Sequence, residues 1–345
     1  MRTDEFSYEL PPGRIAQTPV EPRDASRLMV CRRNTGAIEH RVFRDLTDYL
    51  EPGDALVIND TRVLPARLLG RKAGTGGAVE FLLLKRLTLT SWEALVHPGA
   101  RLAEGVRVEF GEGILTAKIE ARAEGGARLV EFDWDKSTNP AFESLLERLG
   151  RMPLPPYIRE KLADPERYQT VYAARTGSAA APTAGLHFTP ELLRRIEDKG
   201  VDIVRVLLHV GLGTFRPVSA DNVESHEMHA EYYELTDDAA RRINNARLNG
   251  HRAFCVGTTS VRVLESAADE SGILSASTGW TSIFITPGYK FKAVDALVTN
   301  FHLPQSTLLM LVSAFWSREA VLGAYQTAVE EGYRFYSFGD AMMML

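Results

Sequence analysis

Titratable side chains are concentrated in residues 209–231 of this 345-residue chain. Three histidines, one arginine and four carboxylates lie there beside a Gly-Leu-Gly turn: His209, Gly211, Gly213, Arg216, Asp221, Glu224, His226, Glu227, His229 and Glu231. Histidine changes its charge near neutral pH, and a neighbouring carboxylate can orient it. The segment therefore predicts proton transfer or the binding of a charged ligand.

Two of these histidines, His226 and His229, are candidates for metal ligands. A zinc-protease helix places its histidines four residues apart, so that both lie on one helix face with a glutamate between them. Here they are three residues apart, and the sequence specifies no third ligand. A proton-transfer cluster is therefore favoured and no metal is expected; a solvated polar face remains the alternative.

The glycines after His209 do not form a dinucleotide-binding motif. The third glycine of that motif would fall at position 216, which is Arg216, and Pro217 does not fit a helix interior. A tight turn explains the glycines but gives no role to His209 or Arg216. The preceding apolar run, 201–210, is typical of a central strand, with Arg205 as a buried residue.

His187 precedes an expected helix start at Thr189-Pro190, where free N–H groups and partial positive charge gather. An exposed histidine on a capping loop is the alternative. Residues 258–260, Thr-Thr-Ser, follow an expected strand. One of these hydroxyls would cap a helix, and the same geometry binds anions. No lysine follows, so the segment is not a P-loop.

Residues 299–302, Thr-Asn-Phe-His, supply a further polar cluster at a strand end. In open α/β sheets, ligands bind beyond the carboxyl ends of the strands. We therefore expect the clusters at 209, 258–260 and 299–302 to form a single site.

Hydrophobic patterns divide the chain into two parts. Between 61 and 150, short apolar runs recur at roughly 10–12-residue spacing, which indicates a small barrel or sandwich. After the proline-rich joint at 150–156, strands and helices alternate, which predicts an α/β layer with a largely parallel sheet. Expected strands are 28–31, 55–58, 66–69, 78–84, 92–96, 106–110, 114–119, 129–132, 201–210, 253–256, 282–285 and 296–299. Expected helices are 43–50, 139–149, 189–199, 236–249, 259–269, 305–315 and 317–331.

Composition is that of an ordinary globular protein, with 45% hydrophobic and 25% charged residues. The length predicts two domains, since single cores stop growing at roughly 250–300 residues. Cys31 and Cys255 are the only cysteines, which excludes a disulfide framework and fits a reducing cytoplasm. The first residues lack the apolar stretch of a signal peptide, and no run approaches the roughly 20 residues of a membrane span. No membrane association is expected.

The net charge of −5 means that any RNA site must be a local basic patch. Two clusters qualify, the second interleaved with tyrosines: Arg62, Arg67, Arg71 and Lys72, then Arg151, Arg159, Lys161, Arg167 and Arg175 with Tyr157, Tyr168 and Tyr172. Arginine binds phosphate and tyrosine stacks on bases, so these residues predict a reader of single-stranded RNA. Solvated protein faces are the alternative.

Long runs of the chain, in order, resemble the family of S-adenosylmethionine:tRNA ribosyltransferase-isomerases of the queuosine pathway. These runs are FSYELPPGRIAQTPVEPRDASRLMV, NDTRVLPARL, AAPTAGLHF, HVGLGTFRPV, ESHEMHAE, VGTTSVRVLES, TNFHLPQSTLLMLVSAF and GYRFYSFGDAM. The resemblance implies an αβα sandwich with a largely parallel or mixed sheet (1–60 and 151–345) and an inserted small β-barrel domain (61–150).

The resemblance also implies an activity. The ribosyl moiety of S-adenosylmethionine would pass to the 7-aminomethyl-7-deazaguanine base at the tRNA wobble position, giving epoxyqueuosine tRNA, adenine and methionine. S-adenosylmethionine would be consumed as a substrate, with no cofactor. The tRNA partner would present its anticodon loop, in the cytoplasm.

Candidate roles follow from this chemistry. A base must remove a C5′ proton acidified by the sulfonium, and an acid would help adenine to leave. The acid–base candidates are His187, His209, His226, His229, His302 and Glu231. The substrate-binding candidates are Gly211, Gly213, Thr214, Arg216, Thr258, Thr259, Ser260, Arg262, Glu265 and Asn300. The tRNA-binding candidates are Arg62, Arg67, Arg159, Tyr168 and Arg175. The sequence does not say which histidine is acid and which is base.

Three other functions are compatible with parts of the pattern. An S-adenosylmethionine-dependent RNA methyltransferase would share the α/β core and release S-adenosylhomocysteine. A metal-dependent hydrolase would use His226 and His229. A non-catalytic tRNA-binding module would use only the basic clusters.

Overall fold

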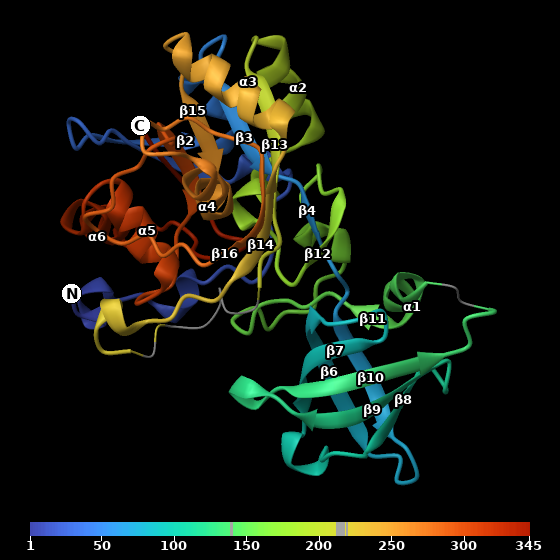
Figure 1. The fold of residues 1–345 in the computed structure, drawn as a ribbon. Coiled ribbons are helices and arrows are strands. Elements are labelled where there is room, and N and C mark those ends of the chain that lie inside the picture. The colour runs from blue at the N-terminus through green and yellow to red at the C-terminus, as the bar shows by residue number, and fades with distance from the viewer. Residues whose placement is uncertain (139–140, 212–217, 219) are drawn as a thin grey trace. The chain divides into compact units, whose positions relative to one another are not determined.

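The computed structural model describes residues 1–138, 141–211, 218 and 220–345. The chain forms two compact units. The first contains Met1–Arg62, Pro155–Thr176 and Ala181–Leu345, and the second contains Val63–Leu154 and Gly177–Ala180. The second unit is thus largely an insertion within the sequence of the first (Figure 1).

A nine-stranded mixed sheet forms the centre of the first unit. Its described strands, in spatial order, are β16 (Ser277–Thr281), β14 (Glu231–Leu235), β13 (Asp202–Leu208), β3 (Ala55–Asn59), β15 (Ala253–Val256), β17 (Ala296–Asn300), β18 (Ala341–Met344), β1 (Arg27–Cys31) and β2 (Ile38–Val42). The central strands β13, β3, β15 and β17 are parallel to one another, whereas β14 beside β13 and β18 beside β17 run antiparallel. Strands β3, β15 and β17 are buried along their whole length, as expected for parallel strands covered on both faces.

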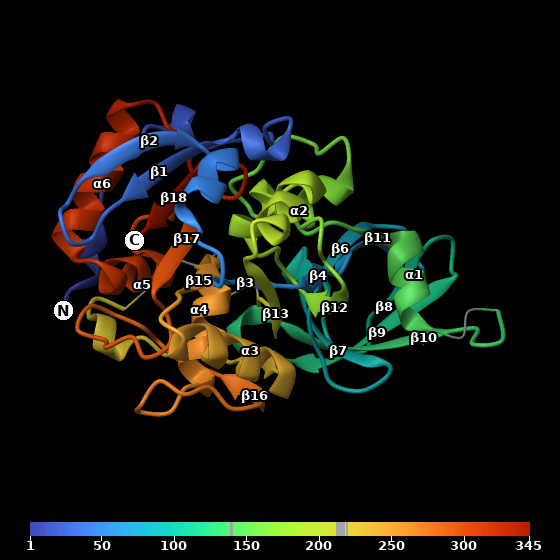
Figure 2. The same ribbon diagram turned by 90° about the horizontal axis from the view of Figure 1, so that it is seen from above.

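Helices cover both faces of this sheet. The described helical segments of the first unit are η1 (Thr3–Phe6), η2 (Pro12–Arg14), η3 (Arg23–Ala25), η4 (Phe43–Tyr49), η7 (Pro165–Tyr168), η8 (Thr183–His187), α2 (Pro190–Asp198), η10 (Val223–Ser225), α3 (Asp237–Leu248), α4 (Gly257–Ala267), α5 (Thr307–Phe315) and α6 (Arg318–Glu330). Figure 2 shows α2 on one face of the central strands and α3 and α4 on the other. Alternate residues of β3 and β15, such as Leu56 and Phe254, pack in one core with Phe188 and Leu192.

Hydroxyl side chains define the starts of these helices. Thr189, Thr236, Ser306 and Ser317 each accept a hydrogen bond from a backbone N–H in the first turn of α2, α3, α5 and α6 respectively. Such caps satisfy donors that the helix itself leaves unpaired. The helix start predicted at Thr189-Pro190 is confirmed, whereas the caps at Thr236, Ser306 and Ser317 are not singled out from the sequence.

The second unit is a small closed β-barrel. Its described strands are β5 (Arg67–Lys72), β6 (Ala78–Arg86), β7 (Ser91–His97), β8 (Arg107–Phe110), β9 (Leu115–Arg122), β10 (Arg128–Trp134) and β11 (Gly150–Arg151), with η5 (Gly99–Arg101), η6 (Glu124–Gly126) and α1 (Phe142–Leu149). The antiparallel order β5-β6-β7-β10-β9-β8 closes on itself through the pairing of β8 with β5. Phe81, Phe110, Phe132 and Phe142 fill the interior. Elsewhere β4 (Thr61–Val63) pairs with β12 (Arg175–Ser178).

The predicted fold class, an α/β layer with a mixed sheet and a small β-barrel, is confirmed. Three local predictions are wrong. Arg205 is exposed, because side chains alternate along β13 and it lies between the buried Val204 and Val206. Residues 282–285 form no strand; the edge strand β16 occupies Ser277–Thr281 instead. Helix α4 begins at Gly257, before the predicted residue 259.

Among the described residues, no single helix has the length and apolar character needed to cross a membrane. Helices α5 and α6, bent by 111° at the break between them, meet that criterion only as a pair.

Candidate active site

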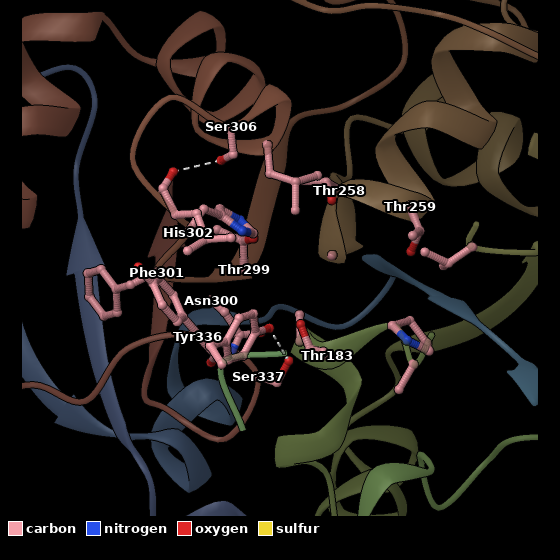
Figure 3. A pocket seen from close by; sticks show the side chains of 18 residues that line it. Thr183, Thr258, Thr259, Thr299, Asn300, Phe301, His302, Ser306, Tyr336 and Ser337 are labelled. Atoms are coloured by element: carbon pink, nitrogen blue, oxygen red, sulfur yellow. Dashed lines mark hydrogen bonds between the residues drawn. The ribbon is translucent and has the colours of Figure 1, made fainter. Parts of the chain in front are cut away.

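A pocket lies at the carboxyl ends of the central parallel strands. It is lined by residues 181–184, 257–259 and 299–303, together with Tyr336 and Ser337. Because β15 and β17 are parallel neighbours, with Val256 paired to Val298, the segments that follow them meet at one edge. Figure 3 shows Thr258 and Thr259 approaching from one of these strand ends, and Thr299 and His302 from the other. Among the described residues, none that lines the pocket is an aspartate, glutamate, lysine or arginine.

His302 lines this pocket and is nearly buried. Its Nε2 lies 2.7 Å from the Oγ1 of Thr299, and its backbone N–H donates to the Tyr325 hydroxyl at 3.0 Å. Burial lowers the pKa of His302 to about 3, so the ring is neutral near pH 7. His302 can therefore donate or accept a hydrogen bond in the pocket, but it does not carry a positive charge there.

His187 is buried beneath the same pocket lining. Its Nδ1 lies 2.7 Å from the Oγ of Ser26, its Nε2 lies 3.1 Å from the Nδ2 of Asn300, and its ring stacks on Phe43 at 4.8 Å. Burial, with smaller contributions from the charges of nearby arginines, lowers the pKa of His187 to about 3. The alternative of an exposed histidine on a capping loop is thus excluded, because His187 is buried and both of its ring nitrogens have buried partners.

The start of α4 forms another part of the lining. Gly257 has a φ of +80°, a left-handed backbone conformation that is strained for residues with a Cβ. Thr258 and Thr259 line the pocket, and the Oγ1 of Thr259 has no hydrogen-bond partner in the described part of the chain. The prediction that residues 258–260 cap this helix is wrong: the N-cap is Val256, and Ser260 instead donates to the carbonyl of Val256 at 2.8 Å.

Glu231 organises a second cluster on β14 and α4. Its Oε1 accepts from the backbone N–H of Gly211 at 2.7 Å and lies 3.2 Å from the Nε2 of His229. Its Oε2 forms a buried ion pair with Arg262. Burial alone would raise the pKa of Glu231, but the hydrogen bond from His229 and the charge of Arg262 outweigh it and hold that pKa below its usual value. Glu231 is therefore ionised and fixes the orientation of the more exposed His229.

His209 and His226 lie outside the pocket lining. The Nδ1 of His209 is 2.8 Å from the Oγ1 of Thr61, and its ring stacks on Tyr232 at 5.9 Å. Burial, followed by the charge of Arg175, lowers the pKa of His209. The ring of His226 packs edge-on against Phe284, and burial with the nearby His229 lowers its pKa.

Not every predicted ligand-binding residue lies at the pocket. Glu265 points instead to the loop 289–293, where it accepts from the Tyr289 hydroxyl at 2.9 Å and from the backbone of Lys292 and Ala293. Gly213, Thr214 and Arg216 lie outside the described residues. Within the described ranges, no three His, Cys, Asp or Glu side chains are grouped as a metal site requires.

A family model described as queuosine biosynthesis protein matches residues 3–344. This chain belongs to the queuosine biosynthesis protein family. A protein named S-adenosylmethionine:tRNA ribosyltransferase-isomerase from Moorella thermoacetica is 60% identical over 345 residues, which is 100% of both chains. One of the same name from Clostridioides difficile is 56% identical over 344 residues and 100% of both. The crystal structure of S-adenosylmethionine tRNA ribosyltransferase from Thermotoga maritima is 42% identical, with a TM-score of 0.57, over 99% of this chain and 100% of that one.

The residues predicted to contact RNA differ in accessibility in this family member. Arg159 is exposed, Arg62 pairs with Glu166 at 2.6 Å, and Arg67 lies 3.5 Å from Glu80. Arg175 is held by two carboxylates, Asp60 at 2.9 Å and Glu234 at 2.8 Å. Tyr168 is completely buried against Phe338, so the prediction that it stacks on a base is wrong.

The structure of this family member adds site residues that sequence reasoning missed. Ser26 and Tyr336 hold His187 and Asn300 respectively, and Thr183 and Ser337 line the pocket. Tyr336 has a φ of +71°, which is uncommon outside glycine and clusters at functional sites. No spacing rule predicts these partners, because Ser26 and His187 are separated by 161 positions in the sequence.

Proposed function

We propose that this chain transfers and isomerises the ribosyl moiety of S-adenosylmethionine onto the 7-aminomethyl-7-deazaguanine base at the tRNA wobble position. Epoxyqueuosine tRNA would form, and adenine and methionine would leave. The observation that carries the proposal is full-length identity of 55–60% to proteins named for this activity. The site geometry supplies groups suited to each step.

His229 is the best candidate for the base that removes a C5′ proton. Its Nε2–H donates to the ionised Glu231, which leaves Nδ1 as the proton-accepting nitrogen. A carboxylate in this position also stabilises the imidazolium that forms when the proton is taken up. Glu231 contacts Gly211, and Gly211 follows the pocket residue Val210.

His302 and the start of α4 are suited to substrate binding. His302 is neutral and lines the pocket, so it can hydrogen-bond to the departing adenine without carrying charge. The first turn of α4 has no side-chain cap at its N-cap residue, and the N–H groups that a helix start leaves available suit the methionine carboxylate. Arg216 stays a proposed partner of that carboxylate. Arg262 is a weaker candidate for binding this carboxylate than Arg216, since its charge is already neutralised by Glu231.

The proposal includes tRNA as the second substrate and the cytoplasm as the location. A wobble base in a single-stranded loop can leave its stack to enter a protein pocket, whereas a paired base cannot do so readily. Arg62 and Arg159 are the accessible candidates for phosphate contacts. No cofactor is part of the proposed reaction.

The decisive experiment incubates the full chain with S-adenosylmethionine and precursor-modified tRNA and quantifies the small products. The proposal expects adenine and methionine in equal amounts and a tRNA whose mass increases by the transferred ribosyl group. Release of S-adenosylhomocysteine with a methylated RNA would instead establish a methyltransferase. Activity abolished by exhaustive chelation would support the hydrolase alternative and contradict the proposed reaction.

A further inference from the structure

The side-chain amide of Asn300 has a fixed orientation in the pocket wall. Its Nδ2 lies 3.1 Å from the backbone carbonyl of Tyr336 and 3.1 Å from the Nε2 of His187. A backbone carbonyl only accepts hydrogen bonds, so the atom facing it must be the amide nitrogen. The orientation of the amide therefore follows from its neighbours.

The Oδ1 of Asn300 is left without a hydrogen-bond partner in the described part of the chain. Asn300 is 2% exposed, so this oxygen is also shielded from water. Buried acceptors are nearly always paired, and one that is not marks a place where a further donor is expected. Since Asn300 lines the pocket, that donor would belong to a bound ligand.

His187 holds this arrangement in place. Because its Nε2 accepts from Asn300, the ring proton lies on Nδ1 and is donated to the Oγ of Ser26 at 2.7 Å. The stacked ring of Phe43 fixes the plane of the imidazole. Both nitrogens are thus used to position the amide, and neither is free to exchange protons with a substrate.

We propose that Asn300 recognises the exocyclic amino group of an aminopurine, with His187 and Ser26 as positioning residues that aim its oxygen. The inference rests on the proposed function and assigns the part of the pocket beside Asn300 to the adenine end of the ribosyl donor, which leaves the start of α4 for the methionine carboxylate. A neutral N–H donor fits because, in the described lining, no carboxylate is present to neutralise an ammonium group. Tyr336 and Phe301 supply flat rings beside the amide (Figure 3). Small side-chain movements of the kind common on binding would admit the amino group to the oxygen.

Binding of two stable ligands to the full wild-type chain tests the assignment directly. S-adenosylhomocysteine carries the 6-amino group, whereas S-inosylhomocysteine carries an oxygen there and presents an acceptor to the Asn300 oxygen. Titration calorimetry should show a preference for the adenine ligand of roughly ten- to hundredfold. Equal affinities would overturn the proposal, and this comparison requires no variant.

Variants then identify the residues responsible. Asn300→Ala should reduce the preference to about one. His187→Leu should do the same, because it frees the amide to rotate, whereas His187→Gln should retain most of the preference because its side-chain oxygen can accept from Asn300. Thermal unfolding of each variant checks that it is folded. A preference unchanged in Asn300→Ala, or lost equally in His187→Gln and His187→Leu, would contradict the assigned roles.

The binding ratio and the reaction assay can fail independently. A chain that releases adenine from S-adenosylmethionine but binds both ligands equally retains the proposed function and refutes this recognition. A chain that discriminates between the ligands but releases no adenine retains this recognition and refutes the proposed function.

Discussion

At the scale of single residues, the most consequential feature is the buried pair of Glu231 and Arg262. Both side chains are almost fully buried, at 2% and 5% exposure, so each depends on the other for charge compensation. Removing one partner of such a pair leaves an uncompensated charge in a medium that solvates it poorly. The same carboxylate also fixes His229 and Gly211, so structure and chemistry depend on one side chain.

Glu231→Gln should lower the free energy of unfolding by about 3–5 kcal/mol, because Arg262 stays buried without a counter-charge. Urea denaturation measures the loss. The double variant Glu231→Gln/Arg262→Met should recover part of it, while the exposed Glu227→Gln should change stability by less than about 0.5 kcal/mol. A double variant no more stable than Glu231→Gln would contradict the charge argument.

His229→Ala should slow the chemical step by roughly 10²- to 10⁴-fold, the usual contribution of a general base. The side chain is 30% exposed, so stability should change little. Single-turnover release of adenine from S-adenosylmethionine measures the rate. The exposed His97→Ala, in the barrel unit, is the matched control. If both variants turned over at the wild-type rate, the base would have to be sought elsewhere.

The two buried histidines make stability depend on pH. The folded-state pKa values of His187 and His302 are about 3, below the unfolded value of about 6.5, so the unfolded chain binds more protons between these limits. Their stabilising contribution is complete above pH 6.5 and is lost as pH falls toward 3, by up to about 1.4 kcal/mol per unit for each histidine. Urea denaturation should therefore give a shallower pH dependence between 6.5 and 4.5 for His187→Gln than for wild type. A comparison at pH 8 isolates the loss of contacts, and parallel slopes would show that His187 is not the titrating group.

At the scale of elements, the sequence predicts the positions of strands and helices more reliably than the tertiary contacts between them. Strand β15 occupies the predicted residues 253–256, because its apolar run is short and followed by glycine. The strand predicted at 282–285 is wrong because an apolar run alone does not show which residues pair. In the structure, the preceding residues of β16 pair with β14 and form the edge of the sheet. The sequence is enough to predict that the clusters at 258–260 and 299–302 lie together, because both follow strands expected to be parallel neighbours. The contact of His187 with Ser26 depends on tertiary packing, which the sequence pattern does not show.

The junction of β15 and α4 offers a test of how an element positions the site. At Gly257, an added Cβ would meet Thr259 Oγ1 at 3.5 Å and Ala184 at 3.6 Å, which are ordinary contacts, so the cost comes from the φ of +80°. Gly257→Ala should therefore destabilise the chain by about 1–2 kcal/mol and weaken S-adenosylhomocysteine binding by shifting Thr258 and Thr259. Gly323→Ala, inside α6 with open space around it, should be neutral or stabilising. Thermal unfolding and calorimetry measure both effects, and equal behaviour of the two variants would exclude the conformational explanation.

At the scale of the whole molecule, the acidic net charge of −5 means that the proposed RNA contact must lie at a local basic cluster. The structure reduces the number of candidate RNA contacts in those clusters, because Tyr168 is buried and Arg175 is neutralised by Asp60 and Glu234. Composition could not reveal this, since it counts charges without their partners. Of the five tRNA-binding candidates, Arg159 is the one classed as exposed, so its removal should disturb little packing.

Arg159→Ala should weaken tRNA binding and reduce the slope of log affinity against log salt by about 0.7, the value for loss of one single-strand phosphate contact. Filter binding of precursor-modified tRNA at salt concentrations between roughly 50 and 200 mM measures the slope. The matched control is Arg194→Ala on α2, which removes an exposed arginine paired to Glu191 within one helix turn. Both variants change the net charge equally, so a general electrostatic effect would lower the two slopes alike. A reduced slope for Arg159→Ala alone would place a phosphate at this residue, and identical slopes would remove Arg159 from the interface.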